Sequence, residues 1–211
     1  MTYTLYAKPL SGNCYKPRLL MAQLGLPYRL IDMAGGKTQA PEFLALNPMG
    51  QVPLLVLPDG SLLSESNAML LFLAEGTPFL PADRYRRALV HQWLFFEQNT
   101  HEPSVAVGRA WQKTHPELIG KATPEQIANW HKRGNKALAV MEQALTGSDW
   151  LSGDAYSVAD MALYAYTHVA EDGGFDLSAY PAIGAWLTRV AARPGHVGLD
   201  WRPDETHGGT A

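Results

Sequence analysis

The chain has 211 residues, of which 46% are hydrophobic and 18% are charged. This is enough apolar material for a buried core and excludes a disordered chain, and the length fits one large domain or two small ones. With 17 basic and 20 acidic side chains the net charge is −3, which gives no electrostatic basis for nucleic-acid binding or for a polybasic membrane anchor.

The single cysteine, Cys14, excludes an internal disulfide and a cysteine-rich zinc site. Six histidines show no metal-like spacing with one another, so we expect no metal site: His91, His115, His131, His168, His196 and His207. The sequence shows no secretory signal pattern and no apolar stretch near the roughly 18–20 residues of a membrane-spanning helix. We therefore expect a soluble, cytoplasmic protein without membrane contact.

Residues 1–80 alternate short strand-like and helix-like segments. Gly25 and Pro27 mark the end of the first helix, and Asp59–Gly60 predicts a hairpin turn. The spacing of apolar residues predicts strands over 2–6, 28–32, 54–57 and 61–63, and helices over 14–24, 41–46 and 65–75. The order β-α-β-α-β-β-α predicts a right-handed parallel crossover followed by a hairpin, which is a four-stranded mixed sheet in a thioredoxin-like α/β domain.

Residues 76–83 contain two prolines and no periodic pattern, and they predict a linker. Beyond it the pattern is helical over 84–107, 124–145, 158–170 and 181–192, so we expect an all-α domain over 84–211. Ser157 and Asp160 form a capping-box pattern at the start of one of these helices. Asp204–Ala211 is polar and glycine-containing, and we expect it to fray.

The turn from the first strand into the first helix carries two candidate catalytic residues. Backbone N–H groups at such a helix start favour negative charge, so the Ser11 hydroxyl could face an anion or simply cap the helix. A thiol in a first helical turn can be nucleophilic, but Cys14 could equally be a small buried apolar residue, which is the interpretation we favour.

Two further loops are expected at the same edge of the sheet. A proline before strand residues is unusual, and a cis Val52–Pro53 bond would turn the Val52 backbone toward the Ser11 turn, whereas a trans bond would mark an ordinary strand start. Ser66 opens a helix and suits a carboxylate, while Glu65 beside it could accept from an ammonium group. Together these acceptors and donors suit an α-amino acid head group, although capping alone would also explain the serine.

This constellation resembles the glutathione transferase family. The resemblance covers the whole chain, from the thioredoxin-like domain through the proline-containing linker to the helical domain, and it rests on the stretches LYAKPLSGNCYKPRLL, NPMGQVPLL, LSES and SVADMAL. The Ser-x-x-Cys turn fits the serine-type subgroup of the family.

The resemblance implies a role for each of these residues. Ser11 would donate a hydrogen bond to the sulfur of glutathione, with Asn13 as a further donor. The γ-glutamyl carboxylate would meet Ser66 and the amine Glu65, and the cysteinyl backbone would pair with Val52, before a cis Pro53. The glycyl carboxylate would meet Lys37 and Gln51.

The resemblance also implies the reaction and the partners. Glutathione is the co-substrate, no other cofactor is needed, and the thiolate attacks a small hydrophobic electrophile. The pocket for that electrophile is expected between the domains, with lining residues Asn99, His101, Arg109, Trp111 and Tyr166. Two alternatives stay open: reduction of disulfides or peroxides through Cys14, and a non-catalytic glutathione- or ligand-binding protein. Family members usually form two-fold dimers, so we expect a homodimer.

Overall fold

The computed structural model describes residues 2–115 and 117–203, and the predicted fraying end, Asp204–Ala211, lies outside the described residues. The chain divides into two compact units, Met1–Glu75 together with Pro194–Ala211, and Gly76–Arg193. The change from the sheet unit to the helical unit therefore falls near the expected linker. The segment from Pro194 onward belongs to the sheet unit, which differs from the expected helical domain over 84–211.

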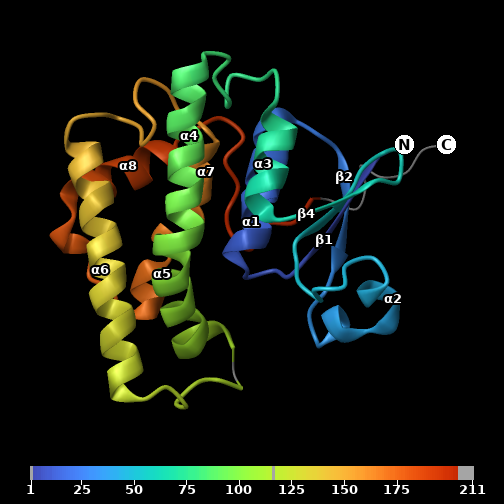
Figure 1. Ribbon diagram of the computed structural model, residues 1–211, viewed down its shortest axis with the longest axis horizontal. Coiled ribbons are helices and arrows are strands. Elements are labelled where there is room, and N and C mark those ends of the chain that lie inside the picture. The colour runs from blue at the N-terminus through green and yellow to red at the C-terminus, as the bar shows by residue number, and fades with distance from the viewer. Residues whose placement is uncertain (1, 116, 204–211) are drawn as a thin grey trace. The chain divides into compact units, whose positions relative to one another are not determined.

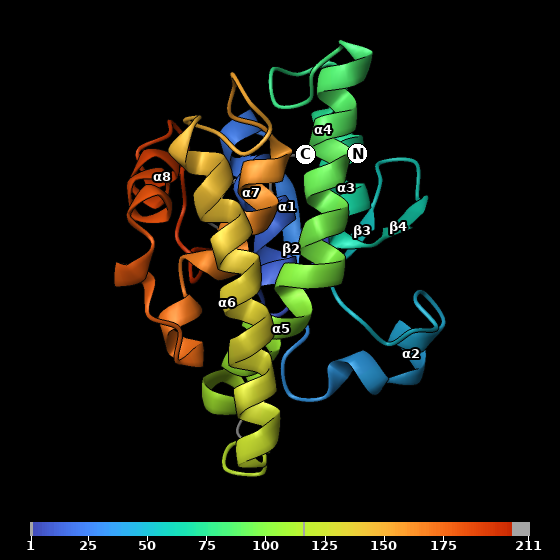
Figure 2. The same ribbon diagram turned by 60° about the vertical axis from the view of Figure 1, so that its left-hand side comes forward.

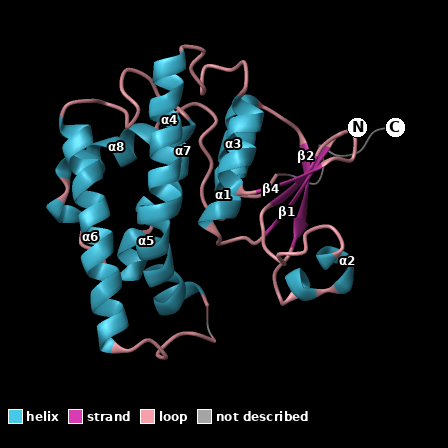
Figure 3. Ribbon diagram, viewed as in Figure 1, coloured by secondary structure: helices cyan, strands magenta, loops and turns pink. Residues whose placement is uncertain are grey.

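The sheet unit contains a four-stranded mixed sheet in the order β2-β1-β3-β4. Its strands are β1 (Tyr3–Ala7), β2 (Tyr28–Asp32), β3 (Leu54–Val56) and β4 (Leu62–Ser64). β1 pairs in parallel with β2 and antiparallel with β3, and β3 pairs antiparallel with β4. Figure 2 shows β3 and β4 side by side. This confirms the predicted thioredoxin-like α/β sheet, and Figure 3 shows its strands in magenta.

The alternation of side chains along β1 assigns the two faces of the sheet. Leu5 is fully buried and lies opposite Leu55 of β3. Tyr6 points to the other face, where it packs against a cluster that contains Phe43 and Leu54. Because successive side chains of a strand point to opposite faces, the sheet has apolar contacts on both sides.

Three α-helices belong to the sheet unit: α1 (Gly12–Leu24), α2 (Pro41–Leu44) and α3 (Ser66–Ala74). α1 and α3 lie side by side in Figure 1, and they contact each other. α1 ends at Gly25, whose φ of 63° is left-handed, as predicted for the residue after a helix. A 3-10 turn, η1 (Lys37–Gln39), precedes α2 and was not predicted, because three residues give no periodic signal.

The helical unit begins with a long interrupted helix. Its elements are α4 (Arg84–Phe96), η2 (Glu97–His101), α5 (Glu102–Arg109), η3 (Ala110–Thr114), α6 (Pro124–Thr146), α7 (Val158–Thr167) and α8 (Pro181–Ala191), with 3-10 turns η4 (Ala170–Gly173) and η5 (Leu177–Ala179). η2 and η3 are π-helical. The sequence predicts one continuous helix here because one extra residue in a turn barely changes a 3.6-residue pattern.

Helix α7 is buried along its whole length. It contacts α4 and α8, and α6 contacts α5 and α8. At the start of α7 the predicted capping box is confirmed. Ser157 Oγ accepts from the Ala159 amide at 3.2 Å, and Asp160 Oδ2 accepts from the Ser157 amide at 2.9 Å. Because α7 is buried on every side, it has no exposed polar face, and its start is marked by the cap.

Candidate active site at the sheet edge

The turn between β1 and α1 presents the Ser11 hydroxyl at a helix N-terminus. Ser11 has extended backbone angles (φ −80°, ψ 122°), and its Oγ accepts from the Cys14 amide at 3.3 Å. The predicted helix cap is therefore confirmed. A hydroxyl that accepts one hydrogen bond still has its own O–H to donate, and the first turn of α1 contains no acidic residue. The cap is thus compatible with an anionic ligand at the same place.

Cys14 lies inside the core of the sheet unit. Its side chain has 0% exposure, and its Sγ accepts from the Lys8 amide at 3.3 Å. Burial raises the pKa of the Cys14 thiol above its ordinary value, against the opposing hydrogen bond with Ser11. A thiol that is both inaccessible and protonated at neutral pH cannot serve as a nucleophile. This burial agrees with the interpretation favoured from the sequence, a small buried apolar residue, and argues against the alternative of a catalytic Cys14.

Asn13, the other candidate on this turn, joins α1 to α3. Its Oδ1 accepts from Ser66 Oγ at 3.4 Å. Asn13 is half-buried, whereas Ser66 is 4% exposed. The proposed sulfur end and the proposed γ-glutamyl end of the site are thus connected by one hydrogen bond.

The start of α3 has an unusual backbone. Glu65, directly before the helix, has a φ of 68°, the one positive value at a non-glycine residue among 2–115 and 117–203. Such a conformation costs of order 1–3 kcal/mol and is often found where a side chain or backbone must be presented to a ligand. Glu65 is exposed, and Ser66 is the first residue of the helix. The pair therefore lies at the start of the predicted helix, with the Glu65 side chain exposed and Ser66 buried.

Lys16 is a member of this cluster that the sequence interpretation missed. Its side chain is 0% exposed, and its Nζ donates to Ser66 Oγ and to Asn67 Oδ1, each at 3.2 Å. A signal was present in the sequence, because Asn13 and Lys16 are three residues apart and so share one face of α1. A lysine on the same face as a candidate ligand-binding asparagine was a reason to look for a site there.

The third loop contains a cis peptide bond between Val52 and Pro53. Pro53 directly precedes β3, and Val52 packs against the apolar cluster that contains Leu54. The Gln51 carbonyl accepts from Asn47 Nδ2 at 2.8 Å, and this bond joins the two ends of the loop before Val52. The question left open by the sequence, cis or trans, is answered as cis.

Lys37 lies in η1, and its side chain is exposed. Its Nζ donates to the Asp32 carbonyl at 3.1 Å. Lys37 and the exposed Gln51 thus belong to loops of the sheet unit, although no hydrogen bond recorded for the described residues joins them to Ser11 or Ser66.

Two of the expected second-substrate residues are tied into the helical unit itself. His101 is fully buried, and its Nε2 lies 3.0 Å from Thr167 Oγ1. Arg109 is 5% exposed and pairs with Asp172 at 3.2 Å. Both side chains make contacts inside the helical unit, and their expected place in the second-substrate pocket stays a prediction.

The other three expected residues are distributed differently. Asn99 is exposed, and its amide donates to the Phe95 carbonyl at 2.9 Å. Trp111 is half-buried, and its ring lies 5.5 Å from that of Trp130. Tyr166 is 8% exposed within the buried helix α7. Of the five, Asn99 and Trp111 have the greatest access to a ligand.

A segment near the C-terminus is fastened to α1. Arg18 donates to the carbonyls of Pro9, Leu199 and Trp201 at 2.9, 2.8 and 2.7 Å. The Tyr15 hydroxyl donates to a further carbonyl of this segment, at Val197, at 2.6 Å. These bonds hold the helix that carries Ser11 in place.

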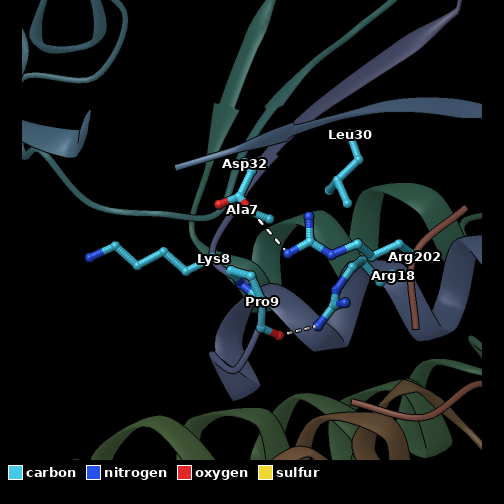
Figure 4. A pocket seen from close by; sticks show the side chains of 7 residues that line it. All are labelled: Ala7, Lys8, Pro9, Arg18, Leu30, Asp32 and Arg202. Atoms are coloured by element: carbon cyan, nitrogen blue, oxygen red, sulfur yellow. Dashed lines mark hydrogen bonds and ion pairs between the residues drawn. The ribbon is translucent and has the colours of Figure 1, made fainter. Parts of the chain in front are cut away.

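A small hollow beside this contact is shown in Figure 4, with lining residues Ala7, Lys8, Pro9, Arg18, Leu30, Asp32 and Arg202. Arg202 pairs with Asp32 at 3.0 Å, and Arg18 is held by main-chain carbonyls. Of the three cationic residues that line the hollow, Arg18 and Arg202 are engaged in internal contacts. We therefore interpret the hollow as part of the attachment of the C-terminal segment.

Within residues 2–115 and 117–203, no group of three or more His, Cys, Asp or Glu side chains is arranged to hold a metal ion. None of the helices described is both long and apolar enough to cross a membrane.

Comparisons with known proteins assign both parts of the chain to one family. Residues 10–75 match the family model for the glutathione S-transferase N-terminal domain, and residues 112–194 match that for the C-terminal domain. The disulfide-bond oxidoreductase YfcG of Escherichia coli is 33% identical over 199 residues, covering 90% of this chain and 90% of that protein.

Two solved structures are similar over nearly the whole chain. A glutathione S-transferase from Pseudomonas fluorescens is 51% identical with a TM-score of 0.89, covering 94% of this chain and 99% of that one. A glutathione transferase from Burkholderia graminis, with two glutathione molecules bound per subunit, is 27% identical with a TM-score of 0.79, covering 92% and 85%.

Proposed function

The chain belongs to the glutathione S-transferase family, and we propose that it binds glutathione at the edge of its sheet and activates the thiol with Ser11. The observation that carries this proposal is the Ser11 hydroxyl at the N-terminus of α1, whose first turn contains no acidic side chain. Such an N-terminus favours a bound anion.

The peptide part of glutathione is held by the other two loops. Ser66 donates to the γ-glutamyl carboxylate and Glu65 accepts from the neighbouring ammonium group, while the Val52 backbone pairs with the cysteinyl backbone before Pro53. Lys37 and Gln51 meet the glycyl carboxylate. The strained backbone of Glu65 supports this assignment, because it turns an exposed carboxylate outward beside a buried hydroxyl.

Thiolate formation is the chemical step that the protein must assist. A free thiol has a pKa near 8.5, and lowering it by about two units requires about 2.7 kcal/mol of preferential thiolate stabilisation. A charge-assisted hydrogen bond from Ser11, together with the α1 dipole, supplies energy of that order. Asn13 is a second donor candidate through its amide group. The reaction requires no metal or organic cofactor beyond glutathione itself.

The activated thiolate then attacks an electrophilic carbon of a small hydrophobic substrate. A sulfur–carbon bond forms, the leaving group departs with its electron pair, and the thiol proton goes to solvent. We propose that Asn99, Trp111 and Tyr166 of the helical unit contact this substrate, and that His101 and Arg109 support them from the interior.

Reduction of a disulfide is a second candidate, favoured by the Escherichia coli relative named as a disulfide-bond oxidoreductase. Because Cys14 is buried, the electrons must come from glutathione alone. One glutathione thiolate attacks the disulfide and releases a thiol, and a second attacks the mixed disulfide to give oxidised glutathione and the second thiol. The Burkholderia graminis structure with two glutathione molecules per subunit supports room for both.

We also propose that the protein forms a two-fold homodimer in the cytoplasm. Phe72 of α3 and Phe95 of α4 are 47% and 67% exposed, and large exposed aromatic side chains favour a covered surface. Light scattering of the purified protein tests this, and a monomer mass at micromolar concentration would remove the proposal.

The transferase proposal is tested by the ultraviolet absorbance of bound glutathione thiolate against pH. We expect the thiolate to persist to about two pH units below the free thiol in the unmodified protein, and to lose that shift in Ser11→Ala. Thr123→Ala is the matched control, because Thr123 is also a helix N-cap, with its Oγ accepting from the Gln126 amide at 3.2 Å.

The alternatives give different results in the same experiment. Glutathione that binds without ionising indicates a binding protein rather than a transferase. A shift that survives Ser11→Ala moves the thiolate donor to Asn13 or the backbone. Absence of glutathione binding removes the proposal altogether.

A further inference from the structure

The bonding of Lys16 fixes the direction of the Ser66 hydroxyl. An ammonium group has three donors and no acceptor, so in the 3.2 Å contact Lys16 Nζ donates and Ser66 Oγ accepts. The Ser66 hydrogen therefore cannot point at Lys16. It is directed away from Lys16, and in this structure it goes to Asn13 Oδ1.

The bond from Ser66 to Asn13 is the weaker member of this chain. Its length of 3.4 Å exceeds the usual 2.5–3.0 Å between two oxygen atoms. A carboxylate is a stronger acceptor than an amide carbonyl, and hydrogen bonds to charged groups are shorter and about twice as strong. A carboxylate arriving at the start of α3 therefore takes the Ser66 hydrogen, while Lys16 continues to hold the oxygen.

Asn67 holds the ammonium group in position. Lys16 Nζ donates to Asn67 Oδ1 at 3.2 Å as well as to Ser66, and the lysine side chain is 0% exposed. A lysine has a long and adaptable side chain, so two acceptors on adjacent residues of α3 restrict where its charge can lie. The bond also orients the Asn67 amide, with its oxygen toward Lys16.

We propose that Lys16 is a positioning residue for glutathione recognition. Resting on the proposed binding of glutathione, it orients the Ser66 hydroxyl as a donor toward the γ-glutamyl α-carboxylate. The orientation is prepared before the ligand arrives, so the ligand does not have to reverse the hydroxyl on binding. Lys16 thereby acts on one carboxylate of the tripeptide and not on its sulfur.

A purely structural role for Lys16 predicts a different pattern. Loss of packing between α1 and α3 would weaken every ligand of this edge alike. Loss of hydroxyl orientation weakens a ligand only where it presents an acceptor to Ser66. The distinction requires two ligands that differ in the strength of the acceptor they present to Ser66, as a carboxylate and a primary amide do.

The experiment compares glutathione with an analogue whose γ-glutamyl α-carboxylate is a primary amide, by calorimetry at constant pH. The unmodified protein is expected to bind glutathione about 10-fold more tightly than the amide, in keeping with a hydrogen bond to a charged group. In Lys16→Met that preference falls to near unity, through weaker glutathione binding with little change for the amide. Lys16→Arg, which only donates, restores part of the preference.

Lys132→Met is the matched control, since it removes an exposed lysine from α6 in the helical unit, and it is expected to keep the full preference. Circular dichroism establishes whether each variant folds. If Lys16→Met does not fold, Lys16→Gln carries the test, because glutamine both donates and accepts and so cannot fix the direction of the hydroxyl. It is also expected to reduce the preference.

The outcomes that contradict the proposal distinguish a wrong role for Lys16 from a wrong proposed function. A preference that survives in the folded Lys16 variants overturns the role of Lys16 while glutathione binding stands. An equal loss for both ligands assigns Lys16 to packing and also overturns the proposal. An unmodified protein that does not bind glutathione overturns the proposed function itself.

Discussion

Two helices of this protein begin with a serine cap, and they differ in what completes the cap. At α7 the carboxylate of Asp160 accepts from the Ser157 amide and hydroxyl, and both residues are buried, at 0% and 1% exposure. At α1 the corresponding third helical position is Cys14, and no acidic side chain lies in the first turn. The first cap is completed by an acidic side chain of the protein itself, whereas the first turn of α1 contains none.

Under the proposed function, one local motif serves folding at α7 and chemistry at α1. Asp160 Oδ1 also accepts from the Leu151 amide and from Trp186 Nε1, each at 3.0 Å, so the α7 cap ties a loop and α8 together. The hydrogen bonds described for the Ser11 side chain are with Cys14, at its amide and its thiol. The caps of Ser11 and Ser157 therefore differ more in their hydrogen bonding than in their sequence patterns.

The largest expected effect is on stability at the α7 cap. Asp160→Ala leaves the Leu151, Ser157 and Trp186 donors without their acceptor, and we expect it to lower the free energy of unfolding by about 3–5 kcal/mol. Urea unfolding measures this. Asp149→Ala is the control, because that side chain is 76% exposed, and its loss is expected to cost below about 1 kcal/mol. Similar values for both variants would show that the α7 cap contributes no more than a surface pair.

The second prediction concerns pH. Burial raises the pKa of Asp160 from 3.8 to about 6, against four hydrogen bonds that lower it. Between these values the folded protein keeps a proton that the unfolded chain has lost, so this group's contribution to stability falls as pH rises from about 4 to about 6. The stability advantage of the unmodified protein over Asp160→Asn is expected to shrink by about 3 kcal/mol across that interval.

Unfolding curves at pH 4 and pH 7 for the two proteins give this difference. An advantage that grows with pH would mean that the four donors outweigh burial and stabilise the ionised carboxylate in the folded state.

A smaller effect separates the two serines themselves. Ser157→Ala removes a buried cap and a contact with Asp160, and about 1–2 kcal/mol of unfolding free energy should be lost, against about 0.5–1 kcal/mol for Ser11→Ala. The order reverses for the bound thiolate, where Ser11→Ala has the effect and Ser157→Ala has none. Parallel urea titrations and thiolate absorbance measure both. Equal effects on the thiolate would end the distinction between the two caps.

The smallest effect is expected at Cys14. Cys14→Ala removes a buried sulfur at a cost of about 1 kcal/mol and leaves turnover of both a transferase and a disulfide substrate unchanged. Steady-state assays check this against the unmodified enzyme. Loss of disulfide reduction alone would restore the cysteine mechanism that burial excludes.

Much of the sheet unit could be predicted from local pattern. β2 has the predicted bounds, and β1 is shifted by one residue. The Asp59–Gly60 turn is confirmed by a φ of 90° at Gly60 and by a hydrogen bond from the Ser61 amide to Asp59 Oδ1 at 2.9 Å. These features depend on neighbouring residues, which is why a single sequence is sufficient to place them.

The features that could not be predicted depend on contacts between distant residues. Lys16 looks like a solvated charge on a helix until the start of α3 is placed beside it. His101 has a residue type that suits a ligand pocket, yet Thr167, 66 residues away, holds it in the interior. Cys14 was ambiguous for the same reason, because its position in the first helical turn does not say which side of α1 faces the core.

The attachment of residues 197–201 to Arg18 and Tyr15 has a consequence for biosynthesis. β1 and α1 leave the ribosome before the helical unit, but the carbonyls of Leu199 and Trp201 that bind Arg18 emerge after it. Domains generally fold as units during synthesis. The helical unit therefore completes its fold while β1 and α1 still lack their contacts with residues 197–201. The strand and helix on either side of the Ser11 turn are thus among the last elements to be fully secured.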